Sequence, residues 1–295
     1  MASEQNVRIA AGKLRIDVNP SIGGSISAFD WVDADRSWPI LRKCHSSNEN
    51  VLDASCFPLV PYVNRIRGAR FTFRGREVAL QPNMPGDPSP LHGQGWLGPW
   101  RVEDSSESSV ALAFRHAAGE WPWDYEARQE FALDEGGLSL HLSCRNKSAD
   151  PMPCGLGQHP YFPCGPQTRI DTQATVAWTI DEQVLPVEEV PAEGRYDLRD
   201  RLACGQGLDN GWSGWGGSAR MTDPGWPFAI QMFSRQARFF QLYSPLEGGI
   251  FVAEPVTHAN AALNEPEEQW HRLGLRVLAA GEEMTLEMRL EVIAK

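Results

Sequence analysis

The stretch Met284-Thr285-Leu286-Glu287-Met288-Arg289-Leu290-Glu291-Val292 alternates apolar with polar residues along its whole length. Successive side chains of a β-strand point to opposite faces of a sheet, so this alternation predicts a strand with one buried and one solvated face. The fold is therefore expected to contain a sheet that contacts water on one side.

Short β-leaning segments continue this pattern toward the N-terminus. They are Val7–Ile9, Leu14–Val18, Arg70–Phe73, Val78–Leu80, Val110–Phe114, Arg128–Leu133, Leu138–Cys144, Phe239–Tyr243 and Ile250–Ala253. Turn-forming clusters such as Arg74-Gly75-Arg76 separate them, in a chain with 27 Gly and 22 Pro. Gly supplies positive φ and Pro presets a turn, so this composition suits many tight reversals. No long run has apolar residues at the helical period, and long helices are not expected.

Repeated strands at hairpin spacing, without alternating helices, predict an all-β fold, namely a large antiparallel β-sandwich with few short helices. At 295 residues the chain could hold one large domain or two ordinary ones. No internal repeat or linker-like change in composition divides it, so we expect a single domain over residues 1–295. The loop-rich stretches around residues 81–90, 191–207 and 255–270 are expected to be binding loops at an edge of the sheets.

Composition and charge narrow the class of protein. Hydrophobic residues make up 42% of the chain and charged residues 22%, which is the balance of a soluble globular protein. The formal net charge of −11 argues against binding nucleic acid or an anionic membrane. It suits an enzyme whose substrate is neutral or cationic.

The lack of a recognisable targeting signal and the spacing of the cysteines favour the cytoplasm as the expected location. The N-terminal residues lack a basic region followed by an apolar one, and no stretch has the length of a membrane span. Six cysteines are scattered without a C-x-x-C pair, which favours reduced thiols over a disulfide framework.

His159 and Glu254 each lie in a short and unusual local sequence. His159 is part of Gly155-Leu156-Gly157-Gln158-His159-Pro160-Tyr161-Phe162, and Glu254 ends the apolar run Ile250-Phe251-Val252-Ala253. An imidazole and a carboxylate at the edges of β-rich segments can add one proton to a substrate and remove another. A buried Glu is rare unless it is paired or functional.

Five local patterns, in order from about residue 20 to the C-terminus, together resemble the aldose 1-epimerase (galactose mutarotase) family. They are Asn64-Arg65-Ile66 with Gly68-Ala69-Arg70-Phe71 and Gly75; Leu91-His92-Gly93-Gln94-Gly95-Trp96 with Trp100; His159-Pro160-Tyr161-Phe162; Gly207-Leu208-Asp209-Asn210; and Glu254-Pro255 with Ala261 and Asn264. Each pattern alone is weak, but five in the same order at reasonable spacing are specific.

The resemblance implies a β-supersandwich whose open cleft binds a free sugar and interconverts its α and β anomers without a cofactor or a metal. Carried over by motif, His159 is the general acid and Glu254 the general base. Arg65, His92 and Asp209 are expected to hold the sugar hydroxyls. The expected partner is a small-molecule sugar, and the chain is expected to be a monomer or a homodimer.

The chemistry of mutarotation suits these residue types. The anomeric O1–H must lose its proton while the ring oxygen O5 gains one, so that the hemiacetal opens to an aldehyde. Rotation about C1–C2 and reclosure then give the other anomer. A protonated His and an ionised Glu can perform both steps, and we expect neighbouring charges to hold them in those forms.

Departures from the family pattern leave the substrate open. Gln158 and Pro160 stand where better-known members of the family have Asn and Ser, and Ala253-Glu254-Pro255-Val256 replaces the usual sequence around the base. These neighbours shape the contacts to the sugar hydroxyls, so galactose and glucose are expectations by analogy.

Two alternative functions and several structural readings remain open. A hexose-6-phosphate epimerase would need a cluster of basic residues to bind the phosphate. One possible source is the group Arg65, Arg67, Arg70, Arg74 and Arg76, which could instead form a solvated face. A non-catalytic sugar-binding protein would retain the cleft alone. Asp209 precedes Asn210-Gly211, a strong turn signal, and His92 could cap a turn. Among the tryptophans, Trp212 is the expected aromatic of the cleft, although most of them should pack in the core.

Overall fold

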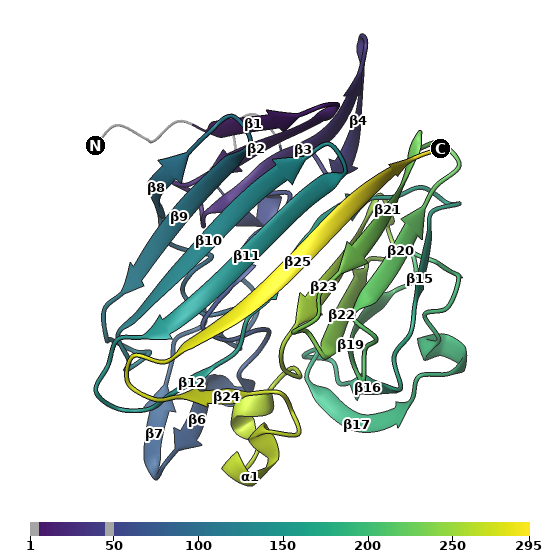
Figure 1. The fold of residues 1–295 in the computed structure, drawn as a ribbon. Coiled ribbons are helices and arrows are strands. Elements are labelled where there is room, and N and C mark those ends of the chain that lie inside the picture. The colour runs from purple at the N-terminus through teal and green to yellow at the C-terminus, as the bar shows by residue number, and fades with distance from the viewer. Residues whose placement is uncertain (1–5, 45–49) are drawn as a thin grey trace.

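The computed structural model describes residues 6–44 and 50–295, which form many strands and little helix (Figure 1). Within these ranges the helical segments are α1 (Glu267–Trp270) and the 3₁₀ turns η1 (Val51–Asp53), η2 (Arg67–Ala69), η3 (Gly194–Tyr196) and η4 (Ala262–Asn264). The expectation of an all-β fold with few short helices is confirmed.

The larger of the two main sheets has nine strands, and each pairs antiparallel with its neighbours. In spatial order they are β18 (Arg201–Leu202), β15 (Arg169–Thr172), β20 (Ser218–Thr222), β21 (Phe228–Phe233), β25 (Glu283–Ala294), β11 (Gly137–Asn146), β10 (Tyr125–Asp134), β9 (Ser109–His116) and β8 (Arg101–Ser105). Its long central strands run side by side across the middle of Figure 1.

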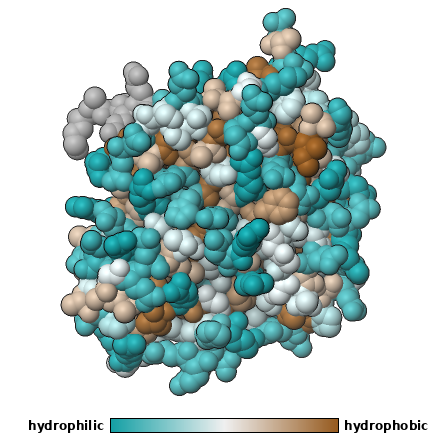
Figure 2. All heavy atoms as spheres, viewed as in Figure 1, coloured by the Kyte–Doolittle hydropathy of each residue, from teal (hydrophilic) through white to brown (hydrophobic). Residues whose placement is uncertain are grey.

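Strand β25 confirms the alternating pattern at the end of the chain. Its apolar residues Met284, Leu286, Met288, Leu290 and Val292 are buried, while the residues between them are half-buried or exposed. The solvated face of this sheet is turned toward the viewer in Figure 2, where mainly hydrophilic and intermediate residues cover it. Burial of one face only is what the period of two requires.

The second main sheet has eight strands and carries the residues expected to be functional. Its order is β17 (Pro186–Pro191), β16 (Val176–Ile180), β19 (Leu208–Ser213), β22 (Phe239–Ser244), β23 (Ile250–Val256), β13 (Gly157–Gln158) and β5 (Pro58–Leu59), and β14 (Tyr161–Pro163) also pairs with β23. Smaller sheets complete the fold. They are β1 (Val7–Ala11), β2 (Leu14–Asn19), β3 (Ser25–Asp33) and β4 (Arg36–Leu41); β6 (Arg70–Phe73) with β7 (Arg76–Ala79); and β12 (Met152–Cys154) with β24 (Arg276–Leu278).

One turn signal of the sequence is wrong. Asn210-Gly211 lies inside β19, between β16 and β22, and is not a turn. The side-chain amide of Asn210 donates to the carbonyl oxygen of Trp178 at 2.9 Å, a bond that fixes it against the neighbouring strand. Pairing on both sides of β19 outweighs the local turn preference of Asn-Gly.

Apolar side chains from both main sheets and from the N-terminal sheet form one continuous buried cluster. The six cysteines form no disulfide with one another. Among residues 6–44 and 50–295, no helix combines the length and the apolar character needed to cross a bilayer.

Candidate active site

The middle of strand β23 brings Glu254 opposite His159. Strands β13 and β14 pair with β23 in one antiparallel register, with a break between them at His159 and Pro160. The paired residues on either side of the break are Gly157 with Val256 and Tyr161 with Val252. The same register continued through the break faces His159 toward Glu254, and Nε2 of His159 lies 3.5 Å from Oε1 of Glu254. The two residues expected to form the acid–base pair are therefore neighbours.

Asp209 lies on the same face of the sheet as Glu254. Gln241 is directly opposite Glu254, and Tyr243 is directly opposite Asp209, on the two sides of β22. Side chains two residues apart on a strand share a face, so these four side chains gather on one side of the sheet. Nε2 of Gln241 donates to Oδ1 of Asp209 at 2.8 Å, which fixes the carboxylate beside the acid–base pair.

His92 comes to the site from the loop between β7 and β8. The backbone N–H of Asn64 donates to its Nδ1 at 3.1 Å, and its own backbone N–H donates to the carbonyl oxygen of Asn64 at 3.0 Å. Because Nδ1 accepts a hydrogen bond, the neutral ring carries its proton on Nε2. Burial, with the nearby His159 and Arg65, holds the pKa of His92 well below its usual value. His92 is therefore a neutral donor.

Arg65 is buried and held at several points. Its Nε donates to Oδ2 of Asp87 at 2.9 Å, and its Nη1 donates to Oδ1 of Asn64 at 3.2 Å. The side chain of Asn260 accepts the backbone N–H of Arg65 at 3.0 Å. Arg65 is thus a fixed cation.

These side chains line one cavity of about 290 Å³. Its lining residues are Leu52, Phe57, Asn64, Arg65, Met84, Leu91, His92, Trp96, His159, Tyr161, Asp209, Tyr243 and Glu254. Five of the six residues singled out in the sequence meet here. The volume is at the small end of the range for small-molecule sites, which suits a single sugar ring.

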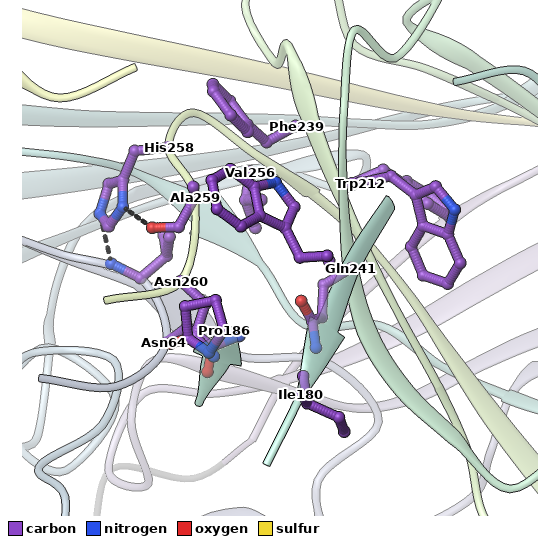
Figure 3. Close-up of a pocket in the computed structure, with 14 residues that line it drawn as sticks. Asn64, Ile180, Pro186, Trp212, Phe239, Gln241, Val256, His258, Ala259 and Asn260 are labelled. Atoms are coloured by element: carbon purple, nitrogen blue, oxygen red, sulfur yellow. Dashed lines mark hydrogen bonds between the residues drawn. The ribbon is translucent and has the colours of Figure 1, made fainter. Parts of the chain in front are cut away.

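Trp212 lies outside this cavity. It is three residues after Asp209 on β19, so its side chain points to the opposite face, and its Nε1 donates to the carbonyl oxygen of Tyr196 at 3.0 Å. It lines instead a separate hollow of about 10 Å³ beside His258 and Asn260 (Figure 3). That volume is about one water-sized sphere, so Trp212 has a packing role and does not belong to the candidate site.

The ring of His159 is fixed by aromatic contacts. It stacks on Phe57 with ring centroids 4.4 Å apart and an angle of 15° between the planes, and it lies 4.7 Å from the ring of Tyr161. Nδ1 of His159 and Oε2 of Glu254 are buried and have no hydrogen-bond partner among the described residues. Buried polar atoms without a partner are costly and mark a place where a ligand can bind.

Burial sets the protonation of the pair. It raises the pKa of Glu254 well above its usual value; the charge of Asp209 adds to the rise and that of Arg65 opposes it. Burial, together with a smaller effect of the charge of Arg42, lowers the pKa of His159 to about 3, although a backbone hydrogen bond opposes the shift. Both directions are opposite to the ionised Glu and protonated His that the sequence suggested. Both shifts favour the uncharged forms of the pair, because loss of water penalises an ionised Glu254 and a protonated His159.

The other arginines of the Asn64-Arg65 motif do not line the cavity. Arg67, Arg70, Arg74 and Arg76 are exposed, and Arg67 donates through Nη2 to the carbonyl oxygen of Pro186 at 2.8 Å. They form a solvated face, which was one of the two alternatives. Within the described ranges, no group of three or more His, Cys, Asp or Glu side chains has the arrangement of a metal site.

Sequence reasoning did not single out Asp87, Phe57 or Tyr243. Asp87 lies in the stretch around residues 81–90 that was expected to be a binding loop, so the sequence indicated the loop but not the residue in it that pairs with Arg65. Trp96, a member of the Leu-His-Gly motif, is the tryptophan that lines the cavity. Phe57 and Tyr243 have no local signal, because only the pairing of distant strands brings them to the site.

Comparisons with known proteins identify the family of the chain. The family model described as aldose 1-epimerase matches residues 6–291. The uncharacterized protein YphB of Escherichia coli K12 is 38% identical over 96% of this chain and 97% of its own length. A crystal structure from Escherichia coli K12 matches 99% of both chains with 36% identity and a TM-score of 0.88. A galactose mutarotase-like protein of Clostridium acetobutylicum shares the fold at a TM-score of 0.86 with 17% identity, over 98% of this chain and 95% of its own. The chain belongs to the aldose 1-epimerase family.

Proposed function

We propose that this protein is an aldose 1-epimerase that interconverts the α and β anomers of a free hexose by acid–base ring opening and reclosure. The observation that carries the proposal is the buried pair of His159 and Glu254, 3.5 Å apart on the wall of a cavity with sugar-sized volume. Each group has one polar atom without a partner. Family membership supports the reaction class.

The reaction needs one proton removed and one added, with no net change. Glu254 takes the proton of the anomeric O1–H while His159 gives a proton to O5, and the C1–O5 bond breaks to leave an aldehyde. Rotation about C1–C2 presents the other face of the carbonyl. O5 then attacks C1 and returns its proton to His159, while Glu254 returns a proton to O1. Each positioned group contributes roughly 10²–10⁴-fold to the rate.

A bound sugar supplies what the pair needs to separate its charges. Burial favours the proton on Glu254, whereas the ring-opening step begins with an ionised Glu254 and a protonated His159. A hydroxyl that donates to Oε2 of Glu254 stabilises the carboxylate, and a ring oxygen that accepts from His159 stabilises the imidazolium. Transfer of one proton across 3.5 Å then prepares the reactive form.

The other polar groups of the cavity suit the hydroxyls of a neutral sugar. Arg65 and the Nε2–H of His92 are donors, and Asp209 is an acceptor. Arg65 is the only Lys or Arg among the described lining residues, and Asp87 already pairs with it. A phosphate dianion would need a further cation, so these groups favour a free aldose over a sugar phosphate.

Polarimetry of freshly dissolved α-D-glucose and α-D-galactose tests the proposal, with wild type and E254Q side by side. We expect wild type to accelerate the change in optical rotation of at least one of these sugars. E254Q, which keeps the shape of the side chain, should lose at least about 10²-fold in kcat. Equal rates in the two proteins would remove Glu254 from the mechanism.

Two further measurements separate the alternatives. Sugar binding without acceleration by wild type would indicate a non-catalytic sugar-binding protein. If the substrate is a free sugar, glucose should bind more tightly than glucose 6-phosphate. It should then protect the protein better against thermal unfolding, because a tighter ligand stabilises the folded state more. The reverse order would favour the hexose-6-phosphate epimerase.

A further inference from the structure

Arg65 lines the cavity, and its ion pair with Asp87 is shielded from water. Nε of Arg65 is 2.9 Å from Oδ2 of Asp87, and the exposed fractions of the two side chains are 9% and 10%. Nη1 of Arg65 also donates to Asn64. Nη2 of Arg65 makes no hydrogen bond to a described residue, which leaves it for a ligand.

Asp87 uses one of its two carboxylate oxygens to fix its own loop. Its Oδ1 accepts the backbone N–H of Ser89 at 2.8 Å, but the loop is also fixed by Asn83. The side chain of Asn83 accepts the backbone N–H of Leu91 at 2.8 Å and donates to the carbonyl oxygen of Leu91 at 2.7 Å. The second carboxylate oxygen of Asp87 is therefore free to serve Arg65.

We propose that Asp87 is a positioning residue that fixes the guanidinium of Arg65, so that its remaining N–H groups meet the hydroxyls of the bound sugar. The inference rests on the proposed function and adds a residue to it. Arginine has a long and flexible side chain, and ordering it at the moment of binding would weaken the affinity. The pair with Asp87 orders the side chain before the sugar arrives.

Substitution of Asp87 tests this role through KM. D87N keeps the size of the side chain and an acceptor for Ser89 but removes the charge that holds Arg65. We expect KM for the free sugar to rise about 10- to 100-fold with a smaller change in kcat, because Arg65 binds ground state and transition state alike. D87A is the comparison, since it removes the acceptor for Ser89 as well as the charge beside Arg65. A rise of KM in D87A with none in D87N would mean that Asp87 acts only on the loop.

A double-mutant cycle with R65M, which removes the cation, makes the assignment specific. If Asp87 acts through Arg65, D87N in the R65M background should add little to the loss caused by R65M alone. Independent effects that multiply would overturn the inference. If D87N does not fold, D87S tests the same contact, because a Ser hydroxyl can still accept the backbone N–H of Ser89 but carries no charge, and an unchanged KM in D87S would overturn the inference.

A crystal structure of D87N without sugar gives a readout independent of turnover. We expect the Arg65 guanidinium to leave its place beside Asn64. An unmoved guanidinium would contradict the positioning role. If wild type binds sugar without turning it over, the proposed function fails by itself, and the same rise is then expected in Kd in place of KM.

Discussion

At the scale of single residues, the candidate site is costly to stability. Oε2 of Glu254 and Nδ1 of His159 are buried without a partner among the described residues. An unsatisfied buried polar atom costs about 1–3 kcal/mol. Such a cost is common where a site is prepared for a ligand, and it agrees with an acid–base pair that a sugar completes.

His159 should act on the chemical step more than on binding. We expect H159N to lower kcat by at least about 10²-fold with a smaller change in KM, because Asn can contact the sugar but cannot deliver a proton. Initial rates of anomerisation over a range of sugar concentrations separate the two constants. H141N is the control, since His141 lies on β11 and does not line the cavity. A large rise in KM with normal kcat would make His159 a binding residue.

At the scale of elements, His159 lies at the break between β13 and β14, where the shared register with β23 faces it toward Glu254. Gly157, the residue before Gln158, packs between neighbouring strands. A Cβ at this position would lie 2.8 Å from Leu59, 2.9 Å from Val256 and 3.0 Å from Val63. Glycine therefore leaves room for the side chains of Leu59 and Val256 on the two neighbouring strands, in the register that faces His159 toward Glu254.

Substitution of Gly157 should damage both stability and activity. G157A overpacks the junction, and we expect the free energy of unfolding to fall by about 1–3 kcal/mol. Because His159 is two residues away, kcat should fall as well. Urea unfolding and polarimetry measure the two effects. In G119A, where the nearest atom to the new Cβ is 3.9 Å away, both should change little. Equal stability of G157A and wild type would contradict the close packing.

The strands that the sequence predicts well are those with a strong local pattern. Ile250–Ala253 and Met284–Val292 lie within β23 and β25, since apolar runs and alternation are local signals. β19 was not predicted as a strand because Asn210-Gly211 has a strong turn preference that only tertiary pairing overcomes. The expectation that Trp212 lines the cavity is wrong for a related reason. The side of a strand that faces a cavity depends on register, and a turn has no register.

At the scale of the whole molecule, the sequence predicts the site residues that belong to local motifs and misses those that only the folded chain brings together. Motif order identified His159, Glu254, Arg65, His92 and Asp209, which line one cavity. It could not identify Asp87 or Phe57, whose contacts join segments with no shared motif. Nor could it give the direction of the pKa shifts in the acid–base pair, because burial depends on the complete fold.

Buried histidines also link the stability of the whole molecule to pH. His258 accepts the backbone N–H of Val63 at Nε2 and donates from Nδ1 to the carbonyl oxygen of Ala259, as Figure 3 shows. The bond that Nε2 accepts requires the neutral ring, and burial lowers the pKa of His258 to about 4. The unfolded chain has an ordinary His pKa of about 6.5. Between these values only the unfolded state takes up the proton.

The free energy of unfolding should therefore fall as the pH is lowered from about 6.5 to 4, by up to about 1.4 kcal/mol per pH unit for His258. His159 acts in the same direction, whereas the raised pKa of Glu254 opposes it, because the folded state then binds the additional proton. Comparison with H258Q isolates His258. We expect the advantage of wild type over H258Q in urea unfolding to stay constant above pH 7.5 and to shrink by about 3 kcal/mol between pH 7 and 4. An advantage that stays constant down to pH 4 would show that His258 accepts a proton in the folded state, and that burial and the bond from Val63 do not hold the ring neutral.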